Sequence, residues 1–112
     1  MEIAIPDELY DLIYEIEDRI DTENQLTQLA EEAAELSQAA LKYRRALQTA
    51  RRDGCISPTP TPGEDAYDSL VEECSDVMLA VLVTSRHLVS NDIMRNKAKR
   101  WLDRLKQYQD EE

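Results

Sequence analysis

Two short acidic motifs hold the residues best suited to chemistry in this 112-residue chain. One contains Glu32 and Glu35, and the other contains Glu73 and Asp76, so each places two carboxylates three residues apart. On an α-helix this spacing brings both side chains onto one face, close enough to share a cation. Acidic residues at this spacing also occur on many solvated helices, so either pair alone is weak evidence for a site.

The position of each pair beside an apolar stripe is more informative than its spacing. When residues are placed at about 100° each, Glu32 and Glu35 border the stripe of their helix, and Glu73 and Asp76 border theirs with the same hand. The stripes consist of Leu26, Leu29, Ala33, Leu36 and Ala40 in the first helix and of Leu70, Cys74, Val77, Met78 and Val81 in the second. If the two helices pack antiparallel through these stripes, both pairs face one groove. Four crowded carboxylates repel one another unless a cation lies among them, and a hard divalent cation with oxygen ligands suits that position.

Four helical segments are expected to position these residues. Apolar residues recur at three- and four-residue spacing over 6–20, from about 22 to 52, from about 65 onward, and after a cap formed by Ser90, Asn91 or Asp92. Pro6 suits the first turn of a helix, and Asp21 with Thr22 can cap the second helix. The Pro-rich stretch predicts a loop over about 53–64, and the tail 109–112 is expected to fray.

The acidic pairs do not lie at equal distances from the predicted loop. Glu35 is far from the end of its helix, whereas Glu73 is close to the start of the next one. In a symmetric hairpin the pairs would therefore miss each other by roughly nine residues, or about 13 Å along the axis. Either the first of these helices overhangs and the loop returns along it, or that helix ends early. The sequence does not decide between the two.

Composition limits the fold class and the partners. Helix-forming residues dominate, Gly occurs only twice, and the length suits a single all-α domain over residues 1–112. The net charge of −11 argues against nucleic-acid binding, and no apolar run is long enough to predict a membrane span. The start of the chain lacks the pattern of a signal peptide, and Cys55 and Cys74 show no metal-binding spacing, so we expect a cytoplasmic protein with reduced thiols.

A chain of this size buries a modest fraction of its surface. Amphipathic helices in a chain this short would leave Leu and Ile side chains exposed that one copy cannot cover. We therefore expect a homodimer or a homotetramer in which a second copy covers them.

The two motifs together resemble the signature of the MazG-like, all-α nucleotide pyrophosphohydrolases. That signature is Glu-Glu-x-x-Glu on one helix and Glu-x-x-Asp on the next, and it is present here as 31–35 and 73–76. The flanking Gln25-Leu26, Leu29-Ala30, Leu36, Ala39-Ala40 and the segment 96–105 are also similar to small members of that family. The similarity covers roughly residues 22–106. One departure is the 37 residues that separate Glu35 from Glu73, more than is usual in the family, with the excess in the Pro-rich loop.

The resemblance implies a four-helix MazG-like bundle completed by homo-oligomerisation. It implies that Glu32, Glu35, Glu73 and Asp76 bind Mg²⁺, with Mn²⁺ as a substitute. It further implies hydrolysis of a nucleoside triphosphate to monophosphate and pyrophosphate, by attack of water at the α-phosphate. Glu31, which is not needed as a ligand, is then a candidate to orient or deprotonate this water, although it also fits an exposed helix position. Within the family, phosphoribosyl-ATP or dUTP alone are alternative substrates.

Four further residues are candidates for substrate contacts. Lys97 and Arg100 could hold the β- and γ-phosphates, since the acidic groove itself offers no cation. Gln25 and Gln28 lie one to two turns before Glu32 on the same face, where an amide could recognise a base edge. For all four, an ordinary helix surface position is the competing interpretation.

Two other functions compete with pyrophosphate hydrolysis. A non-catalytic helical interaction or regulatory protein would carry the same acids on its surface, and Mg²⁺ would not change its stability. A carboxylate-bridged di-iron bundle would normally contain Glu-x-x-His motifs, and this sequence has none.

Overall fold

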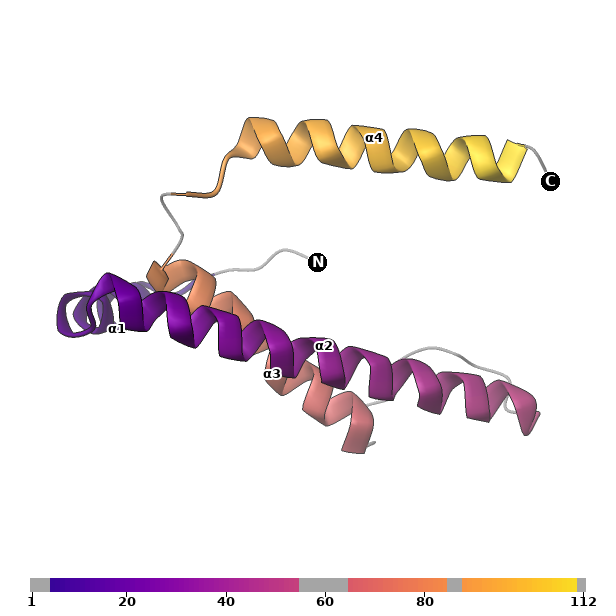
Figure 1. Ribbon diagram of the computed structural model, residues 1–112, viewed down its shortest axis with the longest axis horizontal. Coiled ribbons are helices and arrows are strands. Elements are labelled where there is room, and N and C mark those ends of the chain that lie inside the picture. Colours follow the sequence, from indigo (N-terminus) through magenta and orange to yellow (C-terminus); the bar gives the residue numbers. More distant parts are fainter. Residues whose placement is uncertain (1–4, 55–64, 85–87, 111–112) are drawn as a thin grey trace.

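A computed structural model describes residues 5–54, 65–84 and 88–110 and consists of four α-helices (Figure 1). In chain order they are α1 (Asp7–Arg19), α2 (Thr22–Arg52), α3 (Asp65–Thr84) and α4 (Asn91–Asp110). The described residues contain no β-strand, so the predicted all-α class is confirmed. The predicted Pro-rich loop lies outside the described residues beyond Gly54, and α4 continues two residues into the predicted tail. No helix in the described ranges has the length and apolar character needed to cross a membrane.

Local side chains and one glycine determine where the helices begin and end. The Asp21 carboxylate accepts a hydrogen bond from the backbone N–H of Asn24 at 2.8 Å, and the Ser90 hydroxyl accepts one from the N–H of Ile93 at 3.2 Å. Both residues therefore act as N-caps, as the sequence predicts. Gly54 adopts a φ of 84°, a left-handed conformation that favours glycine, and this ends α2.

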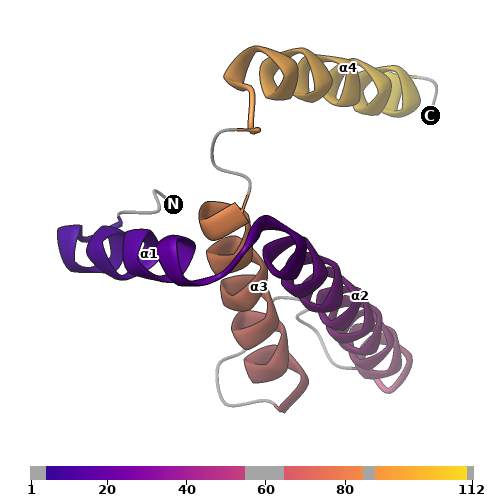
Figure 2. The same ribbon diagram turned by 60° about the vertical axis from the view of Figure 1, so that its left-hand side comes forward.

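The helices α2 and α3 pack together as a crossed antiparallel pair, and α1 contacts α3 (Figures 1 and 2). Their shared core is small, and among the described residues the side chain of Ile13 is the one that is completely enclosed. The buried apolar residues are Ile13, Ala39, Tyr43, Ala80 and Val83. This three-helix body holds α2 and α3 in a fixed register, and that register determines the geometry of the acidic motifs.

The fourth helix stands apart from the other three in both views (Figures 1 and 2). None of its residues is buried, and Trp101 and Tyr108 are 67% and 75% exposed. The single chain is therefore a three-helix body plus a separate helix, rather than four helices packed together. The periodic apolar pattern of α4 predicts a face that must be covered, but the pattern does not specify which surface covers it.

The outer face of α3 also differs from the sequence-based expectation. Cys74 and Met78 belong to the predicted apolar stripe, yet both are exposed, as is the neighbouring Val71, while Ala80 and Val83 are buried. A helix that is apolar on more than one side gives no periodic indication of which side packs first. One chain therefore leaves a second apolar face of α3 open to solvent.

Candidate metal centre

The helices α2 and α3 bring the two acidic pairs together. Glu32, Glu35, Glu73 and Asp76 each present a carboxylate oxygen, and these oxygens all lie within 4.8 Å of one another. We call these four residues the acidic cluster. Its formation confirms the prediction that the two acidic pairs converge.

An overhang of α2 makes this meeting possible. Seventeen residues of α2 follow Glu35, whereas eight residues of α3 precede Glu73. The far end of α2 extends past the beginning of α3, as Figure 1 shows. Of the two arrangements that the sequence left open, the structure adopts the overhanging helix, and the pairs then lie at the same level.

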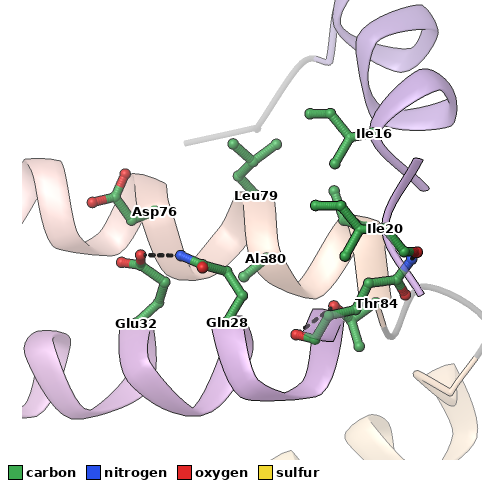
Figure 3. A pocket seen from close by; sticks show the side chains of 10 residues that line it. Ile16, Ile20, Gln28, Glu32, Asp76, Leu79, Ala80 and Thr84 are labelled. Atoms are coloured by element: carbon green, nitrogen blue, oxygen red, sulfur yellow. Dashed lines mark hydrogen bonds between the residues drawn. The ribbon is translucent and has the colours of Figure 1, made fainter. Parts of the chain in front are cut away.

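The acidic cluster lies at the edge of the α2–α3 interface. Glu32, Glu73 and Asp76 are partly buried, and Glu35 is exposed. The amide of Gln28 donates a hydrogen bond of 2.7 Å to Oε1 of Glu32 (Figure 3). The Oε2 atoms of Glu32 and Glu73 are enclosed, and no donor within the described residues reaches either of them. An enclosed carboxylate oxygen without a donor is unfavourable, and a bound cation would satisfy both atoms.

The electrostatics of the cluster point in the same direction. Partial burial raises the pKa of Glu32 and of Glu73 above the ordinary value, and the nearby charges of Glu35 and Asp76 raise both pKa values further. The hydrogen bond from Gln28 lowers the pKa of Glu32 and so offsets part of this effect. The ionised forms of both residues are thus disfavoured in the metal-free fold, and a divalent cation would reverse that preference.

The ligand set fits a hard cation. It consists of carboxylates alone, which suits Mg²⁺, Mn²⁺ or Ca²⁺ better than zinc, which binds His and Cys more often. Opposite oxygens in a Mg²⁺ octahedron are about 4.2 Å apart, because each lies about 2.1 Å from the ion. A spread of up to 4.8 Å therefore needs only small side-chain movements to close around one ion. Four ligands would leave further positions for water and phosphate oxygens.

A pocket of about 200 Å³ adjoins the acidic cluster between α1, α2 and α3 (Figure 3). Glu32 and Asp76 belong to its wall, so the pocket opens directly onto two of the four carboxylates. The remaining lining residues are Ile16, Ile20, Gln25, Gln28, Leu79, Ala80, Val83 and Thr84. An apolar hollow with a few convergent polar groups is typical of small-molecule sites, and this one suits a compact group rather than a drug-sized ligand.

The two glutamines differ in what they contact. The buried side-chain amide of Gln25 donates to the carbonyl oxygens of Ile20 at 2.8 Å and Glu17 at 3.3 Å, at the end of α1. The hydroxyl of Thr84 donates to the backbone carbonyl of Gln25 at 3.3 Å. Gln25 therefore ties together the three helices that enclose the pocket. Gln28 is exposed and contacts the acidic cluster directly. Base recognition by either glutamine stays a prediction.

The other predicted site residues lie outside the acidic cluster. Glu31 is exposed on α2, next to Glu32 of the acidic cluster. Lys97 and Arg100 are exposed on α4, which stands apart from α2 and α3 (Figure 2). Within one chain, therefore, the structure does not bring these two cations to the carboxylates.

Sequence reasoning did not single out the apolar wall of the pocket. Ile16 and Ile20 fit the apolar pattern of the first helix, and Leu79 and Thr84 carry no motif. Their place in the pocket depends on the contact between α1 and α3, which is a tertiary contact that local spacing does not encode. The one available signal is that Ile16 and Ile20 lie one turn apart near the end of α1.

Comparison of the chain with protein-family models, with curated proteins and with solved structures found no match. Over residues 5–54, 65–84 and 88–110 the structure thus shows four α-helices, with a cluster of four acidic residues on α2 and α3.

Proposed function

We propose that this chain is a Mg²⁺-dependent nucleotide pyrophosphohydrolase of the MazG-like type. The observation that supports this most is the convergence of all four motif carboxylates within 4.8 Å. The geometry supports a cation site, and the resemblance of the motifs supplies the reaction. The products would be a nucleoside monophosphate and pyrophosphate.

In this proposal the acidic cluster holds the cation beside the pocket. A bound Mg²⁺ would offset the phosphate charge and make the α-phosphorus more electrophilic. Glu31 is assigned to orient the attacking water or accept its proton. The water oxygen forms a bond to the α-phosphorus, the bond from that phosphorus to the bridging oxygen breaks, and pyrophosphate leaves with that oxygen.

The pocket is assigned to the nucleoside. Its apolar wall of Ile16, Ile20 and Leu79 would contact the flat face of a base, and Gln28 offers an amide at the boundary with the acidic cluster. Lys97 and Arg100 are assigned to the outer phosphates. Since both lie away from the acidic cluster of their own chain, the proposal includes a homodimer or homotetramer.

The direct test is to incubate the purified protein with each common NTP and dNTP, with dUTP and phosphoribosyl-ATP in the panel. Each reaction is run with Mg²⁺ or with EDTA, and pyrophosphate is detected separately from phosphate. Glu35→Gln and Asp76→Asn should each lower the rate at least about 100-fold, since even supporting residues around a metal contribute 10–100-fold.

The matched control is Glu72→Gln, which removes one charge from an exposed position of α3 outside the acidic cluster. This variant should keep its activity. Metal-dependent release of pyrophosphate that only the two cluster variants lose would support the proposal. No release of pyrophosphate from any nucleotide in the panel, or full activity in both cluster variants, would contradict it.

A second candidate function is a non-catalytic helical interaction protein, and the exposed apolar face of α4 favours it. The two candidates differ in their response to metal. The pyrophosphohydrolase should unfold at a higher temperature in Mg²⁺ than in EDTA, because a ligand that binds only the folded state stabilises it. A non-catalytic protein with solvated acids should show no such difference.

A further inference from the structure

The polar side chains on the wall of the pocket differ in what they can still offer to a ligand. Five of the ten lining residues carry such side chains, namely Gln25, Gln28, Glu32, Asp76 and Thr84. Ionised carboxylates only accept hydrogen bonds, whereas amides and hydroxyls contain both donors and acceptors. The hydrogen bonds that the two glutamines and the threonine make inside the protein therefore determine which of their groups remain for a ligand.

The donors of Gln25 are all used inside the protein. Its amide nitrogen carries two hydrogens and donates to the carbonyl oxygens of Ile20 at 2.8 Å and of Glu17 at 3.3 Å. Its backbone N–H donates to the carbonyl oxygen of Asp21 at 3.0 Å. If the amide were turned over, its oxygen would face two carbonyl oxygens, so these partners fix its orientation. The side-chain oxygen of Gln25 is thus the polar atom that remains, and it is an acceptor.

Thr84 and Gln28 are oriented by similar contacts. The single hydroxyl hydrogen of Thr84 is donated to the backbone carbonyl oxygen of Gln25 at 3.3 Å, so the lone pairs of the hydroxyl remain. The amide nitrogen of Gln28 lies 2.7 Å from Oε1 of Glu32 (Figure 3), where an ionised carboxylate requires a donor. The carbonyl oxygen of Gln28 then occupies the other branch of the amide, while the second hydrogen of the nitrogen stays on the branch held by Glu32.

The backbone of the described wall adds no free donor. The N–H of Ile20 donates to the carbonyl oxygen of Ile16 at 3.1 Å, and that of Gln25 is used at Asp21. The other lining residues lie beyond the first turn of α1, α2 or α3, where the helix itself uses each backbone N–H. Away from the acidic cluster, the wall therefore offers apolar surface and hydrogen-bond acceptors.

The acidic cluster and Thr84 lie at opposite ends of the pocket. Asp76 precedes Thr84 by eight residues of α3, which is on the order of 12 Å along the axis. In the proposed function the cation and the α-phosphate lie at the acidic cluster, so the sugar and the base extend toward Thr84 and Gln25 (Figure 3). The edge of the base that is farthest from the sugar then meets the acceptors of these two residues.

We propose that the pocket selects nucleotides whose base carries an exocyclic amino group at this far edge, so that cytosine is preferred to uracil and adenine to hypoxanthine. Cytosine and adenine present an N–H₂ donor there, whereas a carbonyl at the same position is an acceptor. A carbonyl placed against the acceptors of Gln25 and Thr84 loses its water without gaining a donor, which is unfavourable. This inference rests on the proposed function, in which the pocket holds the nucleoside.

The first experiment compares nucleotides that differ in the group at that edge. With Mg²⁺ present, kcat/KM should be about tenfold higher for cytidine triphosphate than for uridine triphosphate, and higher for adenosine triphosphate than for inosine triphosphate. Equal values within both pairs, or a preference for the carbonyl-bearing member, would overturn the inference. Guanosine triphosphate is left out because guanine carries an amino group and a carbonyl together.

A binding measurement separates this inference from the proposed reaction. Calorimetric titration with cytidine monophosphate and with uridine monophosphate, each with Mg²⁺, requires no hydrolysis. The dissociation constant should be about tenfold lower for the cytidine nucleotide. If no triphosphate is hydrolysed but this difference is found, the proposed reaction fails and the inference about the pocket is supported. Equal dissociation constants, or no binding of either nucleotide, would overturn the inference.

A variant at the far end of the pocket tests the acceptors themselves. Thr84→Val keeps the branched shape of the side chain and removes the hydroxyl, so it should lower the cytidine-to-uridine ratio of affinities at least about threefold. The matched control is Thr27→Val, because the hydroxyl of Thr27 donates to the carbonyl oxygen of Glu23 on the exposed part of α2, outside the pocket. It should leave the ratio unchanged. Circular dichroism checks that both variants fold, and equal ratios in the two variants would overturn the role of Thr84.

Discussion

Charged residues are placed differently in the α2–α3 pair and in α4. In the α2–α3 pair, packing forces four carboxylates of like charge together at the edge of a core. In α4, six basic residues share the helix with apolar side chains that no part of the described chain buries. A small cation would stabilise the acidic cluster. Contact with a large apolar surface would stabilise the exposed face of α4. We infer that the two regions recognise different classes of ligand, a metal ion with its substrate and a second protein chain.

Burial explains why the charges of α4 and those of the acidic cluster affect stability differently. Charges on a solvated helix contribute little to stability, since water screens them. Carboxylate oxygens that are enclosed without a donor, such as Oε2 of Glu32 and of Glu73, are unfavourable until something binds them.

The largest effect on folding should come from Ile13. Its side chain is completely enclosed, so Ile13→Ala should lower the free energy of unfolding by about 2–5 kcal/mol. Trp101 is 67% exposed, and Trp101→Ala should change it by less than about 0.5 kcal/mol in a monomer. Urea unfolding of both variants, at a concentration low enough to prevent association, measures the difference. Equal destabilisation would show that α4 is part of the packed body.

Homodimer formation should depend on the exposed face of α4. Trp101→Ala removes the largest exposed side chain of α4 and should weaken the proposed homodimer about 30-fold, the effect of a loss of about 2 kcal/mol at an interface. Asp103 lies on the face of α4 opposite Trp101. Asp103→Ala should therefore leave the dissociation constant within about threefold, because residues outside the centre of an interface usually contribute little. Sedimentation equilibrium gives both constants. If Asp103→Ala weakened the dimer more than Trp101→Ala, the proposed face of α4 would be wrong.

A smaller contrast is expected at the two helix caps. Asp21 caps α2 inside the packed body, so Asp21→Ala should lower the free energy of unfolding by about 1 kcal/mol. Ser90 caps α4, which buries no residue, so Ser90→Ala should leave the unfolding of the body unchanged and only fray α4. Thermal unfolding, followed together with hydrogen exchange of α4, distinguishes the two variants. A large loss of stability from Ser90→Ala would contradict the separate position of α4.

The smallest effect is a dependence of stability on pH in the metal-free protein. The pKa values of Glu32 and Glu73 are raised by partial burial and by neighbouring acids. Their contribution to stability is therefore fully present below the ordinary Glu pKa of about 4.3 and is lost as the pH rises through the raised values. With EDTA present, Glu73→Gln should lessen this loss, and Glu72→Gln, which removes the same charge outside the cluster, should not. Identical pH profiles for the two variants would contradict the assignment.

The helices could be predicted from the sequence because their signals are local. Apolar spacing and the caps Asp21 and Ser90 indicated the bounds, and the stripes placed Glu32, Glu35, Glu73 and Asp76 on facing edges. The overhang of α2 could not be predicted, since it depends on the register with α3 rather than on spacing within either helix. The exposure of Cys74 and the separate position of α4 depend on which surfaces meet, and the periodic pattern does not contain that information.

The most direct test of the central claim is a calorimetric titration of the metal-free protein with Mg²⁺ or Mn²⁺. The acidic cluster predicts saturable binding that Glu35→Gln and Asp76→Asn abolish and that Glu72→Gln leaves intact. Absence of binding, or equal weakening by all three substitutions, would show that the four carboxylates are ordinary surface acids and would contradict the account.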